Sequence, residues 1–121
     1  MKKPPFQKSL LNSLKGILWI LKSERNFQIH VIALVINVIA MAFLKVSAIE
    51  CALLVGMCIL VLVTEALNTC IEKICDFIQP NKDERIRIIK DLAAGAVLLS
   101  AIGAVIVGIL IYYKYILALC K

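Results

Sequence analysis

The sequence predicts an all-α membrane protein with one N-terminal amphipathic surface helix and three transmembrane helices. Of its 121 residues, 62% are hydrophobic and only 18% are charged, a composition that is rare in soluble domains of this size. The apolar residues gather in three long runs, and each run can cross the ~30 Å hydrocarbon core of a bilayer as a helix. We expect residues 1–121 to form a single domain. Because so few helices cannot enclose a large site, a site would need neighbouring subunits.

The N-terminal segment, residues 1–26, is expected to hold the surface helix and a polar break. Leucine and isoleucine recur at helical spacing from residue 10 to residue 21, while lysines occupy much of the other side. This pattern predicts an amphipathic helix over residues 6–22, lying on the cytoplasmic leaflet with Trp19 as its interface anchor. The polar stretch "KSERNF", residues 22–27, should then break the helix.

Three transmembrane helices are expected at about residues 27–46, 48–78 and 86–119. A helix over residues 48–78 would be about 45 Å long, so its last turns should project beyond the membrane into the cytoplasm. Pro80, within "QPNKDE", marks the loop that follows it. The small residues of "AAGA", residues 93–96, favour close contact between helices.

The distribution of basic residues predicts the orientation in the membrane. Lysine and arginine cluster before the first apolar run and around the loop between the second and third runs, whereas Lys45 alone lies between the first two. The positive-inside bias therefore places the N-terminus and the second loop in the cytoplasm and the C-terminus outside. Nucleic-acid binding is not expected, because the basic residues form no patch on a soluble module. The five cysteines include no CxxC pair and lie mostly in apolar helices, so we expect them to act as small apolar residues.

One polar stripe interrupts the second apolar run, in the stretch "VTEALNTCIEKICDF". At about 100° per residue, Glu65, Asn68, Glu72 and Asp76 fall within an arc of about 80°, with Thr69 beside them. An ionised carboxylate at membrane depth is costly, so Glu65, at least two turns inside, needs a cation, a hydrogen-bond partner or a wet cleft. Mg²⁺ would relieve the repulsion, since it binds one or two carboxylates together with substrate phosphates. The alternatives left open are a phosphate-handling active site, a transport site, an assembly surface, and simple anchoring.

Other charged residues are expected at the same membrane level. Glu24 comes just before the first transmembrane helix, and Lys90 and Asp91 stand at the cytoplasmic start of the third. A carboxylate cluster, a lysine and the surface helix could therefore meet at one surface.

Three motifs carry a resemblance to a known family: "ERNFQIH" (24–30), "EALNTCIEKICD" (65–76) and "KDLAAGAVLL" (90–99). Together with their spacing, they resemble the bacterial integral-membrane diacylglycerol kinase and undecaprenol kinase family. The resemblance implies a homotrimer in the bacterial cytoplasmic (inner) membrane, with active sites at subunit interfaces. It also implies transfer of the ATP γ-phosphate to the hydroxyl of a membrane lipid.

The same resemblance implies roles for individual residues. Glu65 would be the general base that takes the proton of the lipid hydroxyl. The other positions would bind ATP and its Mg²⁺ or support the site: Glu24 and Glu72 as metal and ATP ligands, Lys90 and Asp91 as ATP contacts, and Asn68 and Asp76 as supporting residues. His30 and Ser13 are candidate substrate contacts.

The sequence departs from the family pattern at two places. His30 stands where diacylglycerol kinases have an acidic residue, and "IH" is more similar to the undecaprenol kinase branch, so undecaprenol is favoured over diacylglycerol as the acceptor. The second loop, "NKDERIR", lacks the histidine common in that branch, and Lys82, Arg85 or Arg87 would replace it. A small oligomeric proton-coupled transporter is the alternative function, and a non-catalytic assembly subunit is a third.

Overall fold

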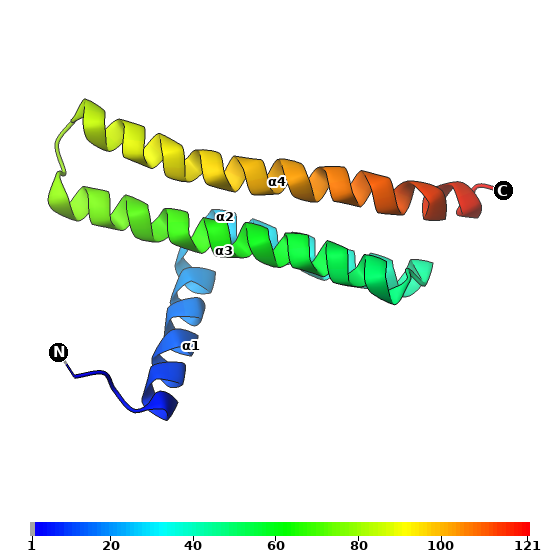
Figure 1. Cartoon of the computed structure of the whole chain (residues 1–121), viewed down its shortest axis with the longest axis horizontal. Coiled ribbons are helices and arrows are strands. Elements are labelled where there is room, and N and C mark those ends of the chain that lie inside the picture. The colour runs from blue at the N-terminus through cyan, green and yellow to red at the C-terminus, as the bar shows by residue number, and fades with distance from the viewer. Residues whose placement is uncertain (1) are drawn as a thin grey trace.

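The computed structural model describes residues 2–121, which form four helices: α1 (Phe6–Ser23), α2 (Arg25–Leu44), α3 (Ala48–Ile78) and α4 (Glu84–Leu119). The last three lie side by side in an elongated bundle, and α1 leaves the bundle at a steep angle (Figure 1). Within these residues, α2, α3 and α4 are long and apolar enough to cross a membrane. The all-helical class is therefore confirmed, while the membrane-surface position of α1 and the trimer stay predictions. Met1, part of the predicted N-terminal segment, lies outside the described residues.

The break between α1 and α2 is much shorter than predicted. Instead of spanning residues 22–27, it consists of Glu24 alone, in an extended conformation with φ −109° and ψ 113°. Gln28 explains the sharp bend, because its Nε2 donates to the backbone carbonyls of Leu21 (3.0 Å) and Lys22 (3.3 Å). Carbonyls in the last turn of a helix have no partner within that helix, so this side chain caps α1 from the first turn of α2. As a result, α2 begins two residues earlier than expected.

The connection between α2 and α3 is a tight turn, and a network of polar side chains fastens this end of the bundle. α2 ends at Leu44, two residues before the predicted end of the first transmembrane helix. Lys45, the residue that follows, adopts the left-handed conformation (φ 54°, ψ 48°). Ser47 caps α3 by accepting a hydrogen bond from the backbone N–H of Glu50 (3.4 Å). The Glu50 carboxylate forms an ion pair with Nζ of Lys114 (2.7 Å) and accepts a hydrogen bond from the hydroxyl of Tyr115 (2.6 Å), both on α4.

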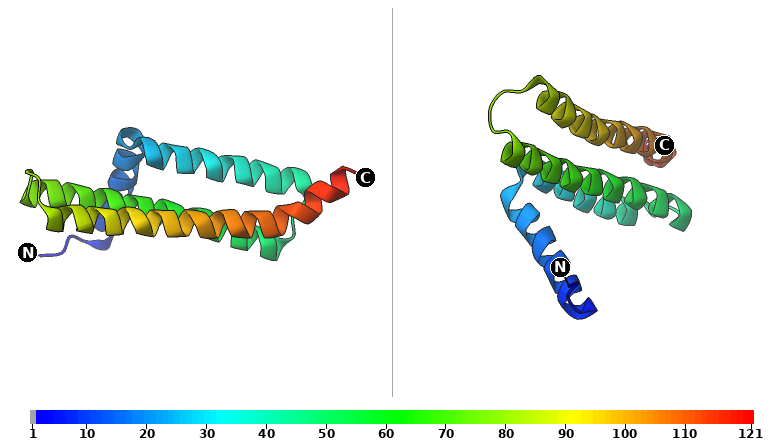
Figure 2. Two further views of the ribbon diagram at one scale, coloured as in Figure 1. Left: turned by 90° about the horizontal axis from the view of Figure 1, so that it is seen from above. Right: turned by 60° about the vertical axis from the view of Figure 1, so that its left-hand side comes forward.

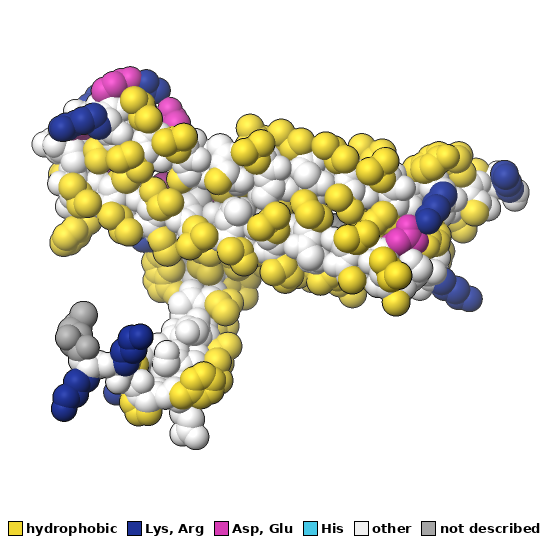
Figure 3. All heavy atoms as spheres, in the orientation of Figure 1, with side chains coloured by type: hydrophobic (Ala, Val, Ile, Leu, Met, Phe, Trp, Pro, Cys, Tyr) yellow, Lys and Arg dark blue, Asp and Glu magenta, His cyan; other side chains and the backbone are white. Residues whose placement is uncertain are grey.

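Helix lengths agree with a membrane position. With 20 residues, α2 is about 30 Å long, which matches the ~30 Å hydrocarbon core. With 31 and 36 residues, α3 and α4 are about 46 Å and 54 Å long. Both extend beyond the start of α2 at the loop end, the end of the bundle where residues 79–83 connect α3 to α4 (Figure 1; Figure 2, left). Apolar side chains cover the visible face between charged ends (Figure 3).

Apolar packing and polar contacts join the helices inside the bundle. Met41, Leu54 and Ile111 form a buried cluster that holds α2, α3 and α4 together near the α2–α3 turn. Deeper in the bundle, the hydroxyl of Tyr112 donates to Oδ1 of Asn37 (2.9 Å). Since an unpaired amide in hydrocarbon is costly, this bond fixes how α4 sits against α2.

Candidate functional site

The predicted polar stripe lies on one side of α3 and becomes more exposed toward the loop end. Glu65, Asn68 and Thr69 are buried, with relative exposures of 4%, 7% and 4%. Glu72 and Asp76, about two and three turns beyond Glu65, are exposed. The stripe therefore connects the interior of the bundle with the surface at its loop end.

Glu65 faces a basic side chain from the neighbouring helix. The Nε2 atom of His30, on α2, lies 3.7 Å from Oε2 of Glu65. His30 is five residues past the start of α2, so the pair lies about 8 Å along that helix from its start. The sequence required a partner for the buried Glu65, and the structure supplies His30, which the sequence left open as a satisfied interfacial histidine or a contact to lipid or nucleotide.

Asn68 and Glu72 form the middle of the stripe. Nδ2 of Asn68 donates to Oε1 of Glu72 at 3.2 Å, one turn along the same helix. The other side-chain atom of Asn68, Oδ1, is buried and has no hydrogen-bond partner among the described residues. Buried polar atoms are nearly always paired, so an oxygen without a partner beside a carboxylate indicates a place where a further group binds.

The exposed end of the stripe contacts α4. Nζ of Lys90 lies 2.5 Å from Oδ1 of Asp76, and this ion pair joins α3 and α4 at the loop end. Asp91 pairs instead with Nη1 of Arg87 (3.1 Å), and Nη2 of the same guanidinium pairs with Glu84. A cleft of about 530 Å³ opens here, between the α3–α4 loop and the side chains of Asp76, Arg87 and Lys90. Of the predicted ATP contacts, Lys90 therefore lines this cleft and Asp91 lies beside it.

The loop itself is ordered by a helix cap. Oδ1 of Asp83 accepts from the backbone N–H of Arg85 (2.9 Å), and Oδ2 accepts from its guanidinium (2.9 Å). These hydrogen bonds from Arg85 hold the pKa of Asp83 below its ordinary value of 3.8. Arg85, one of the expected nucleotide contacts in the loop, is therefore engaged in holding the start of α4, whereas Lys82 lines the cleft.

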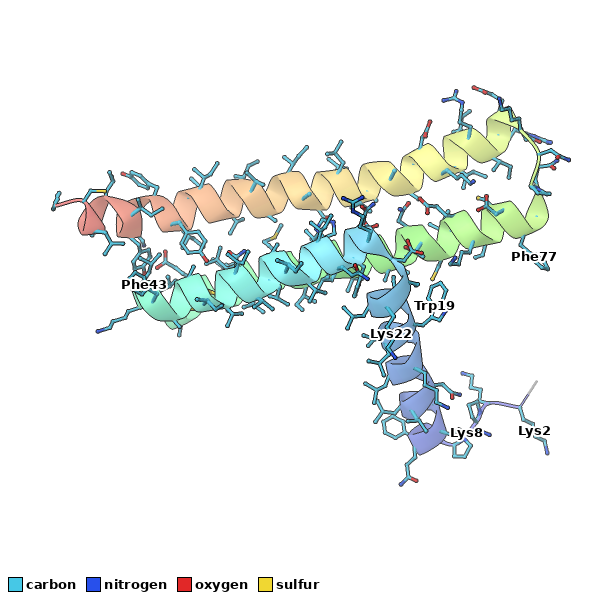
Figure 4. The ribbon with its side chains drawn as sticks, turned by 180° about the vertical axis from the view of Figure 1, so that it is seen from behind. Lys2, Lys8, Trp19, Lys22, Phe43 and Phe77 are labelled. Atoms are coloured by element: carbon cyan, nitrogen blue, oxygen red, sulfur yellow. The ribbon has the colours of Figure 1, made fainter. Side chains whose placement is uncertain are left out.

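Two predicted site residues are not brought to the stripe by contacts within the chain. Ser13 donates its hydroxyl to the carbonyl of Ser9 (3.0 Å) on α1. Figure 4 shows α1 pointing away from the bundle, with Lys8 far from it. Glu24 lies at the bend between α1 and α2. In residues 2–121, no three His, Cys, Asp or Glu side chains come close enough to hold a metal ion, so Glu24 and Glu72 belong to no such group.

Two contacts near the site were missed by sequence reasoning. Nζ of Lys73 lies 4.8 Å from the ring centroid of Trp19, a cation–π contact that ties the end of α1 to α3. The hydroxyls of Thr64 and Ser100 lie 2.9 Å apart and join α3 to α4 next to Glu65. Small polar residues within apolar runs were the available signal for the second contact. The first depends on the one-residue bend at Glu24, where the sequence predicted a longer break over residues 22–27.

The fold and the stripe define a class: a small helical membrane protein whose polar site begins between its spanning helices and ends at the water-exposed loop. The sequence pattern of the prokaryotic diacylglycerol kinase family matches residues 11–112, and the chain belongs to this family of kinases. The resemblance recognised from the three motifs is thereby confirmed.

Individual relatives are named either diacylglycerol kinase or undecaprenol kinase. The chain is 42% identical over 94 residues to the diacylglycerol kinase of Synechocystis sp., covering 77% of this chain and 54% of that protein, so it spans about half of that relative. It is 34% identical over 107 residues to the undecaprenol kinase of Bacillus subtilis, covering 88% and 87% of the two chains. It is 32% identical over 105 residues to the diacylglycerol kinase of Escherichia coli, covering 85% and 84%. With three apolar helices and bacterial relatives, the chain is a bacterial membrane protein.

Proposed function

We propose that this protein transfers the γ-phosphate of ATP to the hydroxyl of a membrane lipid alcohol. The observation that carries the proposal is the position of Glu65, which is 4% exposed, faces His30 and begins a stripe that ends in the exposed Lys90–Asp76 pair. An alcohol embedded in the bilayer and a nucleotide dissolved in water can reach opposite ends of this one stripe. Family membership supports the same reaction.

The reaction needs one proton acceptor and correct positioning. In the proposed step, Glu65 takes the proton of the lipid hydroxyl, and the hydroxyl oxygen forms a bond to the γ-phosphorus. The bond between that phosphorus and the oxygen bridging to the β-phosphate breaks, and ADP leaves with the electron pair. Phosphoryl transfer depends mainly on positioning and on offsetting phosphate charge, so we assign Lys90 and Asp91 to contacts with ATP and Asp76 to holding Lys90.

The donor atoms around Glu72 fit Mg²⁺. Glu72 provides carboxylate oxygen, and the neighbouring Oδ1 of Asn68 is a buried oxygen without a partner among the described residues. Mg²⁺ usually takes one or two carboxylates and completes its shell with water and substrate phosphate, so a cluster of three acidic side chains is not required. We propose that Glu72 and Glu24 hold the ion. When bound, it would offset the negative charge of the ATP phosphates.

We propose undecaprenol as the preferred acceptor and diacylglycerol as the alternative, giving undecaprenyl phosphate or phosphatidic acid. The motif "ERNFQIH" supports undecaprenol, because its "IH" is more similar to the undecaprenol kinase branch of the family than to the diacylglycerol kinase branch. Relatives named for each of the two lipids match this chain over more than 80% of its length.

We propose a homotrimer with shared sites in the cytoplasmic membrane, its N-terminus and α3–α4 loop in the cytoplasm and its C-terminus outside. Since α1 points away from its own bundle, Ser13 would serve the stripe of a neighbouring copy (Figure 4). Mixing two inactive variants, Ser13→Leu and Glu65→Gln, tests this arrangement. If sites are shared, a mixed oligomer can combine the intact Ser13 of one chain with the intact Glu65 of another, and activity returns. If each site lies within one chain, the mixed oligomers stay inactive.

Phosphate transfer from labelled ATP tests the function itself. Purified protein in detergent micelles with Mg²⁺ would be given undecaprenol or diacylglycerol in separate tubes. We expect labelled lipid in one or both tubes, with faster phosphate transfer to undecaprenol than to diacylglycerol. If a well-folded oligomer labels neither lipid, the kinase proposal is wrong, and proton-coupled transport becomes the explanation for Glu65.

A further inference from the structure

The three spanning helices form a half-open apolar cavity on the side of His30 that leads away from the loop end. Its volume is about 370 Å³, near the lower limit of the roughly 300–1,000 Å³ typical of ligand sites. All three helices line it, with His30, Ala33 and Asn37 from α2, Met57 and Cys58 from α3, and Gly108 from α4 among the lining residues. The cavity is therefore inside the part of the bundle that spans the membrane.

The lining favours hydrocarbon over polar ligands. The amide of Asn37 is already satisfied, because its Nδ2 donates to the carbonyl of Ala33 (2.8 Å) and its Oδ1 accepts from Tyr112 (2.9 Å). Alanine, glycine, valine and methionine supply most of the remaining surface. A polar molecule bound here would lose its hydrogen bonds to water without replacement, whereas dry apolar cavities accept apolar ligands.

His30 connects the cavity to the proposed base. The side chain that lines one end of the cavity is the one whose Nε2 lies 3.7 Å from Oε2 of Glu65. A lipid alcohol with its hydroxyl at Glu65 therefore has an apolar space directly beside its first carbons. A helix of a second copy, about 10–12 Å wide, is too large for this volume.

We propose that this cavity binds the first segment of the hydrocarbon chain of the lipid acceptor, and that its size admits one hydrocarbon chain at a time. This inference rests on the proposed kinase function. It makes Ala33 and Gly108 specificity-determining residues, because both keep the cavity open.

Filling the cavity should weaken lipid binding and leave nucleotide binding unchanged. Ala33→Leu places a larger side chain in the cavity, and Ala42→Leu makes the same change on an exposed part of α2 that does not line it. Ala33→Leu adds three carbons, and one methylene in an apolar pocket already changes discrimination by about tenfold, so we expect KM for undecaprenol to rise at least tenfold with an unchanged KM for ATP. Ala42→Leu should keep both values.

A second pair of variants, with smaller changes in side-chain size, controls for misfolding. A Cβ added at Gly108 or at Gly56 would meet no atom within 4 Å, so both glycine-to-alanine changes fit the fold. Gly108 lines the cavity and Gly56 does not. Gly108→Ala should therefore raise KM for undecaprenol severalfold, while Gly56→Ala should not.

Photo-crosslinking gives a readout that does not need catalysis. Cys58 and Met57 lie about 10–12 Å along α3 from Glu65. A polyprenol with a diazirine in its second isoprene unit, added without ATP, should therefore label Met57 or Cys58, and Ala33→Leu should suppress this labelling. Labelling elsewhere, together with an unchanged KM in Ala33→Leu and Gly108→Ala, would overturn the cavity assignment. Absence of phosphate transfer by the unaltered protein would instead contradict the proposed function, and crosslinking would still test the cavity.

Discussion

His30 on α2 and Glu65 on α3 face each other inside the bundle, with Nε2 and Oε2 separated by 3.7 Å. The Glu65 side chain is 5% exposed and the His30 side chain 25%, so the acid is the more deeply buried partner. A carboxylate at this depth is stabilised by a nearby hydrogen-bond donor or cation, and His30 can be either. The arrangement therefore makes His30 a positioning residue for the proposed base.

Replacing His30 by alanine tests this role. We expect kcat to fall roughly tenfold to a hundredfold, because misplacing a reacting group by about 1 Å can cost a factor of that size. KM for ATP should not change, since His30 lies away from the loop-end cleft. Steady-state kinetics would measure both values, with His30→Lys retaining more activity than His30→Ala. Equal kcat in the alanine variant and the unaltered protein would show that Glu65 does not depend on His30.

Lys90 should matter for ATP more than for stability. Its ion pair with Asp76 joins side chains that are 36% and 64% exposed, and exposed pairs contribute little to stability. Lys90→Met should therefore raise KM for ATP at least tenfold and leave the melting temperature almost unchanged. Lys114→Met, which removes a lysine paired with Glu50 at the opposite end, is the matched control and should keep KM for ATP. A large loss of stability without a change in KM would assign Lys90 a structural role instead.

The hydrogen bond between Thr64 and Ser100 should stabilise the packing of α3 against α4. The two hydroxyls lie 2.9 Å apart, and Ser100 is buried. Hydrogen bonds between membrane helices contribute about 0.6 kcal/mol on average and up to about 1.7 kcal/mol. We expect Ser100→Ala to lower the free energy of unfolding within that range, measured by reversible denaturation in mixed micelles. A double-mutant cycle with Thr64→Val should show coupling, and strict additivity would mean that the bond contributes nothing.

The cap at the start of α4 predicts a weak acid sensitivity. The folded-state pKa of Asp83 is lowered, mainly by its side-chain hydrogen bond from Arg85. The stabilisation is therefore fully present above the ordinary value of 3.8 and is lost as pH falls through the lower folded-state pKa. Between pH 6 and pH 3, the melting temperature of the unaltered protein should fall more than that of Asp83→Asn. Parallel curves for the two proteins would show that the cap does not contribute.

The sequence predicted the architecture well, because periodicity and helix length carry that information. Hydrophobic runs defined three spanning helices, and helical geometry alone placed Glu65, Asn68 and Glu72 on one side of α3. The sequence also placed Lys90 at the same membrane level as the carboxylates, and the structure pairs it with Asp76. These features follow from hydrophobic periodicity and segment length, which can be read from a single sequence.

Features that depend on inter-helix geometry were not predictable. The one-residue break at Glu24 arises because Gln28 reaches back to the carbonyls of α1, a contact that no local propensity encodes. The contact between Trp19 and Lys73 depends on that bend. The pairing of His30 with Glu65 depends on the rotation of α2 against α3, and hydrophobic periodicity does not define it in a helix that is apolar on every side.

The most direct test of the central claim is the activity of Glu65→Gln. This variant keeps the size of the side chain and removes its ability to accept the hydroxyl proton. Glu50→Gln makes the same change on the same helix, at the end farthest from the loop, and serves as the matched control. With labelled ATP, Mg²⁺ and undecaprenol, we predict that a folded Glu65→Gln protein loses about 100- to 10,000-fold in rate, while Glu50→Gln stays close to the unaltered protein. A Glu65→Gln variant that keeps most of its activity would contradict the assignment of Glu65 as the base.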